Sequence, residues 1–311
     1  MSIPTLKISD GTVIHPLKMP KKAQKEGIFV EWSSEVIRSR QNRAVVELCK
    51  LTDRKAREAT KCFRFDGVKL FCEAVKNGVE LQTVFIKESR QNAVQTLAAE
   101  KGLSRAFEGE GRVMILSDDL FDKISEEKSP EGIICCAKYI DKFQKNITIY
   151  NSADFLRMKN EQIVLLESVR DPSNIGAIIR SAAAIGVDRL IISADCADIY
   201  HPKAVRASMG TLFNQPIDRV ADLAAAIEGL RYSGRRVFAA ALDGHAQTLG
   251  HFPIQAGDCV VIGNEGHGLT EGTVAACDAC VMIPMTDRAE SFNAAVAASL
   301  LMWEFVQKIG R

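Results

Sequence analysis

The chain has 311 residues, of which 47% are hydrophobic and 25% are charged, so its length suggests two domains and its composition excludes a disordered or fibrous chain. The net charge of +1 hides an asymmetry, because residues 1–160 carry 28 Lys and Arg against 22 Asp and Glu, whereas residues 161–311 carry 12 against 17. The excess lies mostly in residues 1–64, with 14 basic side chains against 7 acidic ones, which is compatible with a polyanion partner and equally with a solvated basic face.

The first half of the chain predicts a small α/β domain behind a basic extension. Residues 1–34 hold several Lys, Pro and Gly and form the extension, and residues 35–140 form the domain. A helix is expected from Ile37 to Leu51, and Ser117 is expected to cap a helix over 118–124. The other expected elements are helices over 68–76 and 93–99 and strands over 61–65, 84–86, 113–116 and 132–138. Residues 141–160 are polar and weakly periodic, so we interpret them as a linker.

The second half, residues 161–311, alternates strands with helices, which predicts a mostly parallel sheet. A helix should follow the first strand, with Asp171 as its N-cap and Pro172 at its first position. Asn174 and Arg180 then lie near the carboxyl end of a strand, where ligands bind in open α/β sheets. The strands are expected over 162–167, 188–193, 236–242, 259–263 and 280–283, with a long last helix over 291–309.

The nine cysteines are scattered and odd in number, which fits a reducing compartment. Cys277 and Cys280 have no second pair of ligands beside them, so we expect no zinc site and no other metal. No run of about 20 apolar residues exists, and the segment Met1–Gly27 has no signal-peptide core. We therefore expect a cytoplasmic protein without a membrane anchor.

Four polar clusters in the second half could carry chemistry, at residues 174–180, 203–210, 261–270 and 283–293. The third is rich in glycine but is not a nucleotide loop. Glu271 stands where the third glycine of a dinucleotide-binding loop belongs, and Leu269 replaces the lysine of a P-loop. What remains is a glycine-rich turn with Glu265 at its centre, which alone would also fit a tight turn with a solvated carboxylate.

Together the clusters resemble the motifs of the SpoU–TrmH family of RNA ribose methyltransferases, within the SPOUT superfamily. The family motif Asn-x-Gly-x-x-x-Arg is matched by Asn174, Gly176 and Arg180. The other motifs are Gly-Asn-Glu-Gly at 263–266, Ile-Pro-Met at 283–285, Ser-x-Asn at 291–293 and a lysine- and arginine-containing segment at 202–210. Their order and spacing make the resemblance specific. One departure is Phe292, which stands where the family usually has leucine and alters the shape of an apolar wall.

The first half resembles, more loosely, the small ribosomal-protein-like domain with which many such enzymes bind RNA. Residues 39–42, Leu51 and residues 65–69 carry this resemblance. The basic excess supports it independently, because phosphate contacts dominate affinity for nucleic acids. The predicted RNA contacts are basic side chains, of which the last two could instead contact a second copy of the chain: Arg40, Arg43, Lys69, Lys203 and Arg206.

The resemblance implies methyl transfer from S-adenosylmethionine to a ribose 2′-hydroxyl of RNA. The methyl carbon of this cofactor is already electrophilic, so the protein mainly aligns the reactants and manages one proton. The implied fold is a parallel sheet whose last part forms a trefoil knot, with loops near 242–245, 263–268 and 283–293. By motif position, the cofactor pocket is lined, largely through backbone atoms, by Leu242, Gly263, Asn264, Gly266, Ile283, Met285 and Phe292.

Arg180 is by the same matching the leading catalytic residue, surrounded by Asn174, Glu265, Ser291 and Asn293. Such families assign this arginine as a general base, but a guanidinium stays protonated near neutral pH, so the alternative is that Arg180 clamps a phosphate and polarises the hydroxyl. Glu265 would then orient Arg180 or accept the proton itself. The plain alternatives are a surface ion pair for Arg180 and helix capping for Asn174 and Ser291.

The family also implies a homodimer, and part of the apolar last helix is expected to pair with a second chain; its apolar residues are Leu300, Leu301, Trp303, Phe305 and Val306. We expect the substrate to be structured RNA, ribosomal rather than transfer RNA. The alternatives are a tRNA ribose methyltransferase, a base methyltransferase of the knotted superfamily, and a non-catalytic RNA-binding protein that keeps the fold.

Overall fold

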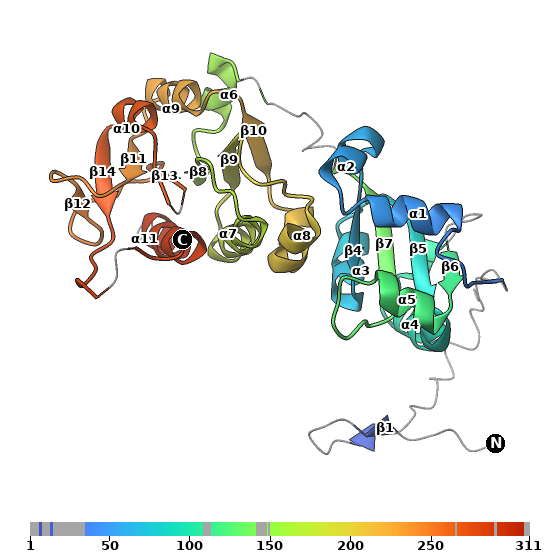
Figure 1. The fold of residues 1–311 in the computed structure, drawn as a ribbon. Helices are drawn as coiled ribbons and strands as arrows, with labels where there is room; N and C mark the ends of the chain where they lie inside the picture. Colours follow the sequence, from blue (N-terminus) through green and yellow to red (C-terminus); the bar gives the residue numbers. More distant parts are fainter. Residues whose placement is uncertain are drawn as a thin grey trace.

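The computed structural model describes residues 6–7, 13–14, 35–107, 113–140, 148, 150–264, 266–288 and 291–307. The chain forms two α/β domains, each built on its own sheet (Figure 1). We refer to residues 35–140 as the amino-terminal domain and to residues 150–307 as the carboxyl-terminal domain. The predicted basic extension lies outside the described residues except for the antiparallel pair β1 (Leu6–Lys7) and β2 (Val13–Ile14).

The amino-terminal domain has a mixed five-stranded sheet in the order β3-β6-β5-β7-β4. Its strands are β3 (Val36–Ile37), β4 (Cys62–Asp66), β5 (Leu81–Lys87), β6 (Val113–Leu116) and β7 (Ile133–Lys138). Its α-helices are α1 (Arg43–Lys50), α2 (Arg54–Thr60), α3 (Val68–Lys76), α4 (Gln91–Glu100) and α5 (Asp118–Ile124). Buried side chains of α3 and α4 join one hydrophobic cluster, whereas those of α1 and α5 join another. The sheet is therefore covered on both faces.

The expected helix from Ile37 to Leu51 is wrong at its start. Val36 and Ile37 pair with β6 as an edge strand, and α1 begins only at Arg43. Asn42 sets this boundary, because its Oδ1 accepts a hydrogen bond from the backbone N–H of Ala44 at 3.0 Å. Ser117 lies at the N-cap position of α5 as expected but makes no side-chain capping bond.

The carboxyl-terminal domain has a seven-stranded sheet in the order β10-β9-β8-β13-β11-β14-β12, and all its paired strands are parallel. Its strands are β8 (Ile163–Leu166), β9 (Arg189–Ser193), β10 (Ile217–Val220), β11 (Val237–Ala240), β12 (Gln247–Thr248), β13 (Cys259–Ile262) and β14 (Ala279–Met282). Its α-helices are α6 (Ser152–Arg157), α7 (Pro172–Ile185), α8 (Pro202–Ser208), α9 (Leu223–Tyr232), α10 (Glu271–Ala276) and α11 (Ala294–Gln307). Helices α7, α8 and α11 cover one face and α6, α9 and α10 the other (Figure 1). The predicted parallel-sheet fold class is confirmed.

Helix α7 begins where the sequence predicts. Asp171 caps it by accepting hydrogen bonds from the backbone N–H groups of Ser173 and Asn174, and Pro172 occupies its first position. Gly186 ends it in the left-handed conformation, with φ of 96°. Both ends of the helix are therefore encoded locally.

Part of the predicted linker is helical. Asn151 and Asp154 form a reciprocal capping box that begins α6. Phe155 is buried and packs against Gly229 of α9, where an added Cβ would lie 2.1 Å from the ring. Residues 152–157 thus belong to the packed carboxyl-terminal domain.

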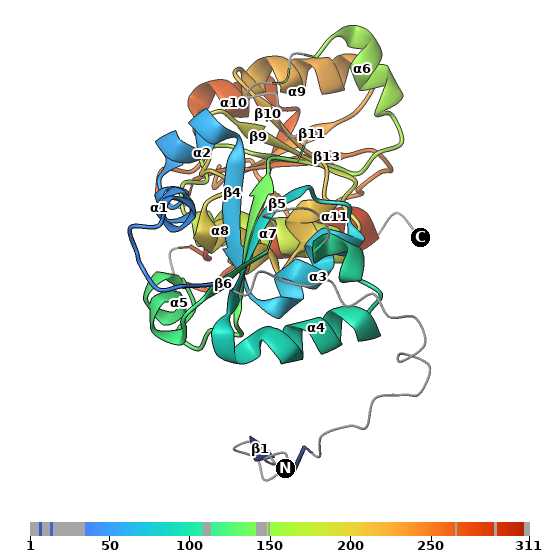
Figure 2. The same ribbon diagram turned by 90° about the vertical axis from the view of Figure 1, so that its right-hand side faces the viewer.

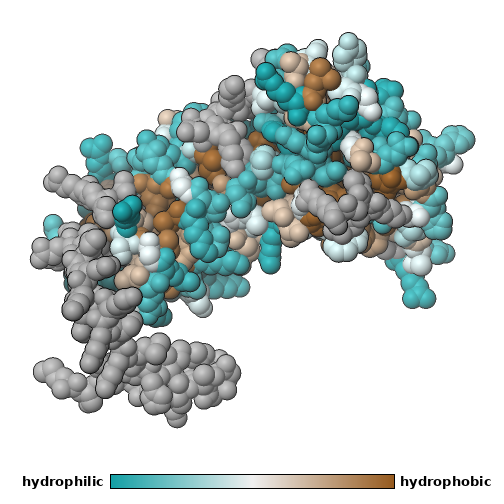
Figure 3. Space-filling model, turned by 180° about the vertical axis from the view of Figure 1, so that it is seen from behind, coloured by the Kyte–Doolittle hydropathy of each residue, from teal (hydrophilic) through white to brown (hydrophobic). Residues whose placement is uncertain are grey.

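The two domains contact each other through β4 and α8, which lie side by side in both ribbon views (Figures 1 and 2). One hydrophobic cluster runs through both domains and includes Phe63 and Phe65 on one side and Tyr200 and Phe213 on the other. Among the coloured residues of Figure 3, hydrophilic side chains predominate and hydrophobic patches lie between them. Within the described residues, no helix has the length and apolar character needed to cross a membrane.

Candidate active site

Three of the four predicted clusters meet at one edge of the parallel sheet. Strands β8, β13, β11 and β14 are consecutive neighbours, so their carboxyl ends point the same way. The segments that leave those ends carry Asn174 and Arg180 after β8, residues 263–268 after β13, and residues 283–293 after β14. The parallel sheet therefore gathers groups that are far apart in the sequence.

Asn174 and Asn293 join the first and last clusters directly. The Nδ2 of Asn293 donates a hydrogen bond to the Oδ1 of Asn174 at 3.0 Å, across 119 residues of chain. The Oδ1 of Asn293 accepts from the backbone N–H groups of Ala295 and Val296, so Asn293 rather than Ser291 caps α11. Asn293 is thus held by its own helix while it contacts α7.

Arg180 lies on the exposed side of α7, between its two flanking contacts. It is six residues beyond Asn174 and so about a third of a turn away around the helix. Ser181 instead faces α11 and accepts a hydrogen bond from Ser299 at 2.8 Å. Arg180 is exposed, and among the described residues no carboxylate forms an ion pair with it.

The loop after β13 is held in a tight turn by Asn264. Its Nδ2 donates to the carbonyl of Ser168 at 2.8 Å, and its Oδ1 accepts from the backbone N–H groups of Gly266 and His267. A Cβ on Gly263 would lie 2.4 Å from the carbonyl carbon of Gly268, so this turn requires glycine there. The side chain of Asn264 therefore shapes the loop. Glu265 lies outside the described residues.

Glu167 braces the same loop and is a residue that sequence reasoning did not select. It is buried at the end of β8, and its carboxylate accepts hydrogen bonds from the backbone N–H and hydroxyl of Thr270 and from the hydroxyl of Thr273. These bonds satisfy a buried charge and attach the end of the loop to the sheet. A carboxylate directly after an apolar strand was the signal that could have identified it.

The predicted cofactor residues are brought to this edge with different degrees of exposure. Leu242 is 72% exposed and Phe292 is 39% exposed, whereas Ile283 and Met285 are half-buried. Ser291 is exposed and begins the approach to α11. Exposed apolar side chains beside a tight glycine turn form a surface that an aromatic or aliphatic ligand would cover.

Helix α8 packs closely on α7 through the glycine of the first motif. A Cβ on Gly176 would lie 2.3 Å from the carbonyl oxygen of Ala204 and 2.8 Å from the Cβ of Ala207. Gly176 is therefore required by packing between two helices. The same helix carries Lys203 and Arg206, which are both exposed.

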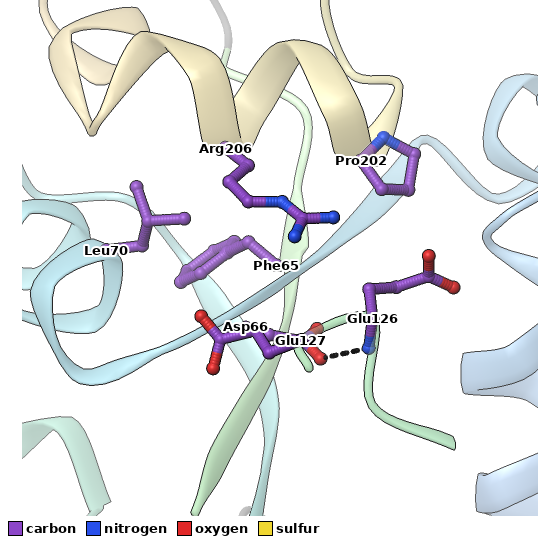
Figure 4. Close-up of a pocket in the computed structure, with 7 residues that line it drawn as sticks. All are labelled: Phe65, Asp66, Leu70, Glu126, Glu127, Pro202 and Arg206. Carbon is purple, nitrogen blue, oxygen red and sulfur yellow. Dashed lines mark hydrogen bonds between the residues drawn. The ribbon is translucent and has the colours of Figure 1, made fainter. Parts of the chain in front are cut away.

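Arg206 faces a small pocket between the two domains. Figure 4 shows Arg206 projecting from α8 over Phe65, with Asp66, Glu126 and Glu127 of the amino-terminal domain on the far side. Burial raises the pKa of Glu127, while the charge of Arg206 acts in the opposite direction. Arg206 therefore contributes charge to the domain interface, and its role as an RNA contact stays a prediction.

The predicted RNA contacts of the amino-terminal domain are all exposed. Arg40 precedes α1, Arg43 begins it and pairs with Glu47 one turn further on, and Lys69 lies in the first turn of α3. None of the three is buried in packing, so each guanidinium or ammonium can reach a phosphate.

Cys277 and Cys280 are both free thiols and half-buried. Across the part of the chain that the structure describes, no three His, Cys, Asp or Glu side chains are grouped closely enough to hold a metal ion.

Comparison with known proteins agrees with this geometry. Family models for the SpoU rRNA Methylase family and for an MRM3-like substrate binding domain match residues 161–303 and 42–135. The chain is 32% identical to the 23S rRNA (uridine(2479)-2'-O)-methyltransferase of Streptomyces viridochromogenes over 83% of this chain and 87% of that protein. It is 27% identical to the 23S rRNA (guanosine(2553)-2'-O)-methyltransferase of Bacillus subtilis over 86% and 97%. A solved structure of an AdoMet-bound rRNA methyltransferase from Sinorhizobium meliloti matches with a TM-score of 0.72 and 25% identity, over 89% of this chain and 99% of that one.

Proposed function

The chain belongs to the SpoU rRNA methylase family, and from that premise we propose that it transfers a methyl group from S-adenosylmethionine to a ribose 2′-hydroxyl of ribosomal RNA. The observation that carries the proposal is the hydrogen bond from Asn293 to Asn174, which lies on the same helix as exposed Arg180. It unites the first and last motifs of the family in one site. A protein that only binds RNA needs no such convergence.

The edge formed by the loops after β11, β13 and β14 fits the cofactor. Gly263 leaves no room for a side chain in the turn, and exposed Leu242 and Phe292 offer apolar surface to an adenosine or a methionine chain. With Ile283, Met285 and the backbone near Gly266, these residues would hold S-adenosylmethionine, which supplies an electrophilic methyl group. Glu167 and Asn264 keep the turn in shape. The same three loops are the ones that we propose to form the trefoil knot.

Arg180 would act on the RNA. Its planar guanidinium can donate two parallel hydrogen bonds to a phosphate and so place the neighbouring ribose. Its positive charge also stabilises negative charge that develops on the 2′-oxygen. The proton then passes to a base, for which Glu265 and Arg180 itself are the two candidates. We favour Glu265, because a guanidinium remains protonated near neutral pH.

The amino-terminal domain would supply the RNA affinity. Arg40, Arg43 and Lys69 are exposed on it, and Lys203 is exposed on α8 at the boundary with the other domain. Each phosphate contact adds affinity that falls with salt concentration. We place this activity in the cytoplasm, where ribosomal RNA is found.

A second copy of the chain would cover the outer face of α11. Val296, Leu300 and Trp303 recur at helical spacing there and are 47%, 40% and 58% exposed. An apolar stripe of this kind is typical of a protein–protein contact. We therefore propose a homodimer that pairs through α11.

The test is methyl transfer from tritiated S-adenosylmethionine to ribosomal and transfer RNA isolated from cells that lack the gene. We expect label in ribosomal RNA, and mass spectrometry of nuclease digests should place it on a ribose. Arg157→Ala, an exposed arginine on α6 paired only with Asp154 in the described structure, is the control variant for Arg180→Ala.

The alternatives predict different results in the same assay. Label in transfer RNA alone would indicate the tRNA enzyme, and label on a base would indicate the base-methylating branch. Tight RNA binding without cofactor binding in a thermal-shift assay would show a non-catalytic RNA-binding protein. Any of these results contradicts the proposal.

A further inference from the structure

A buried ion pair joins the two domains. Arg57 of α2 is only 1% exposed, and its Nη2 and Nε donate hydrogen bonds to the Oδ2 of Asp198 at 2.7 and 3.0 Å. The two residues are 141 positions apart in the chain. Separating the domains would break both of these charge-assisted hydrogen bonds, whereas removing one partner in the closed interface would leave the other charge uncompensated.

Each partner is also fixed within its own domain. The Nη1 of Arg57 donates to the carbonyl oxygens of Leu51 and Thr52 at 2.7 and 2.9 Å, where α1 ends. The Oδ1 of Asp198 accepts from the backbone N–H of Tyr200 at 2.9 Å, in the turn that leads into α8. The ion pair therefore connects the end of α1 to the start of α8 through short, directional bonds.

An aromatic layer beside the ion pair fixes the same orientation by shape. The rings of Tyr139 and Tyr200 stack with centroids 3.9 Å apart, and the Tyr200 hydroxyl accepts from the backbone N–H of Ile140 at 2.9 Å. Phe65 and Phe213 pack across the interface with centroids 5.4 Å apart. Such packing resembles a protein core rather than a loose contact between domains.

Helix α8 transmits this orientation to the site. It begins directly after the turn at Asp198, and its backbone at Ala204 lies against Gly176 of α7 with no space for a methyl group. Helix α7 also carries Asn174 and Arg180. Arg57, α8 and α7 thus form a continuous rigid connection.

We propose that the Arg57–Asp198 pair fixes the distance between the proposed RNA contacts of the amino-terminal domain, Arg40, Arg43 and Lys69, and the guanidinium of Arg180, and so selects the ribose that is methylated. The inference rests on the proposed function. RNA bound to the amino-terminal domain would then reach Arg180 only with the ribose that lies at this fixed distance from the bound phosphates. Arg57 is a positioning residue, because it is buried and acts through Asp198 and α8.

The test compares Arg57→Met with a matched control in the full-length protein. Arg64→Met is the control, since Arg64 is also 1% exposed and pairs with a carboxylate, that of Asp66, but within the amino-terminal domain. Arg57→Lys keeps the charge and should restore part of the effect. Asp198→Asn keeps an acceptor for the Tyr200 N–H and is the second variant if Arg57→Met fails to fold.

Three measurements separate positioning from simple destabilisation. We expect Arg57→Met to lower kcat on ribosomal RNA by about 10-fold or more and to spread methylation to neighbouring nucleotides, because small misplacements of reactants are costly. The affinity for S-adenosylmethionine should stay within about twofold, since the substitution does not touch the loops after β11, β13 and β14 that we propose to bind it. Solution X-ray scattering should show a larger radius of gyration for Arg57→Met than for Arg64→Met.

Methylation by Arg57→Met at the same single nucleotide, with unchanged kcat and scattering, would overturn this proposal. A fall in activity that Arg64→Met reproduces would also overturn it, because that result reports stability alone. If the wild-type protein methylates no RNA, the proposed function fails. The scattering comparison then still decides whether Arg57 holds the domains together.

Discussion

The two helices that flank α7 hold it in different ways. On one side, Gly176 of α7 packs directly against the backbone of Ala204 in α8. The turn before α8 carries Asp198, which pairs with Arg57 of the amino-terminal domain. On the other side, α11 meets α7 through polar side chains, with Asn293 bonded to Asn174 and Ser299 to Ser181. The outer face of α11 remains apolar and exposed.

This difference gives the two sides of α7 different roles, one toward the amino-terminal domain and one toward the candidate active site. The close contact between Gly176 and the backbone of Ala204 fixes α7 relative to α8 and so to the amino-terminal domain, because it leaves no room for an added atom. The polar contacts of α11 hold Asn174 and Ser181, while the outer face of α11 remains apolar and exposed. Arg180 lies between these contacts and is covered by neither, so it stays available to substrate.

Arg180→Ala removes the exposed charge between the two contacts and should have the largest effect. We expect methyl transfer to fall by about 100-fold or more, since one positioned donor at a reacting centre typically contributes that much. Cofactor affinity, measured by calorimetry, should change less than about twofold, because Arg180 lies in α7 and not in the loops that we propose to bind the cofactor. With Arg157→Ala as the control, activity of Arg180→Ala within twofold of wild type would show that the assigned role is wrong.

Trp303→Glu tests the α11 side. Trp303 is the largest and most exposed side chain of the stripe, so a charge in its place should weaken dimerisation by roughly 30-fold or more, as expected for the loss of an aromatic anchor. Sedimentation velocity over a concentration series measures this directly. Tyr232→Glu is the control, because Tyr232 is 82% exposed on α9, away from the stripe. A wild-type protein that sediments only as a monomer would refute the proposed interface.

Gly176→Ala tests the α8 side. Its Cβ would overlap the carbonyl oxygen of Ala204, so α7 and α8 must move apart. We expect the free energy of unfolding to fall by about 1–3 kcal/mol, the usual cost of overpacking. Gly272→Ala in α10 is the control, because nothing lies within 4 Å of its added Cβ. Equal stabilities of the two variants in urea denaturation would mean that the close contact is not rigid.

Local signals account for the parts of the fold that the sequence predicts well. Asp171 and Pro172 define the start of α7, and the predicted bounds of α3, α5 and β6 match the structure. The error at Ile37 arises because a two-residue edge strand has no periodicity of its own and gains its identity only from pairing with β6. The capping box at Asn151 was a readable signal for α6 that polar composition obscured.

The site was predictable as a set of residues but not as a set of contacts. Parallel strands must end together, so motifs that follow them converge whatever their separation in the sequence. The bond from Asn293 to Asn174 depends instead on how α11 packs against α7. Arg57 and Asp198 carry no motif at all, and only the docking of the two domains makes them partners.

His201 provides the smallest test, on the α8 side. It caps α8 by accepting a hydrogen bond from the Lys203 backbone N–H at its Nδ1. Partial burial and then the charge of Arg57 lower the pKa of His201, with Lys203 acting in the same direction and Asp198 and Glu126 against it. The unfolded chain therefore binds this proton more readily than the folded protein.

The sign of the pH dependence follows from that lowered pKa. The contribution of neutral His201 to the stability of the fold is complete above the ordinary histidine pKa of about 6.5. It is lost as the pH falls from there through the lowered pKa of the folded protein. His201→Asn keeps a capping oxygen but cannot titrate, so its Tm should fall less than that of wild type between pH 7.5 and 5.5. If the Tm of the two proteins falls equally between pH 7.5 and 5.5, protonation of His201 does not weaken the start of α8. The contact between α8 and α7 would then depend on packing at Gly176 alone.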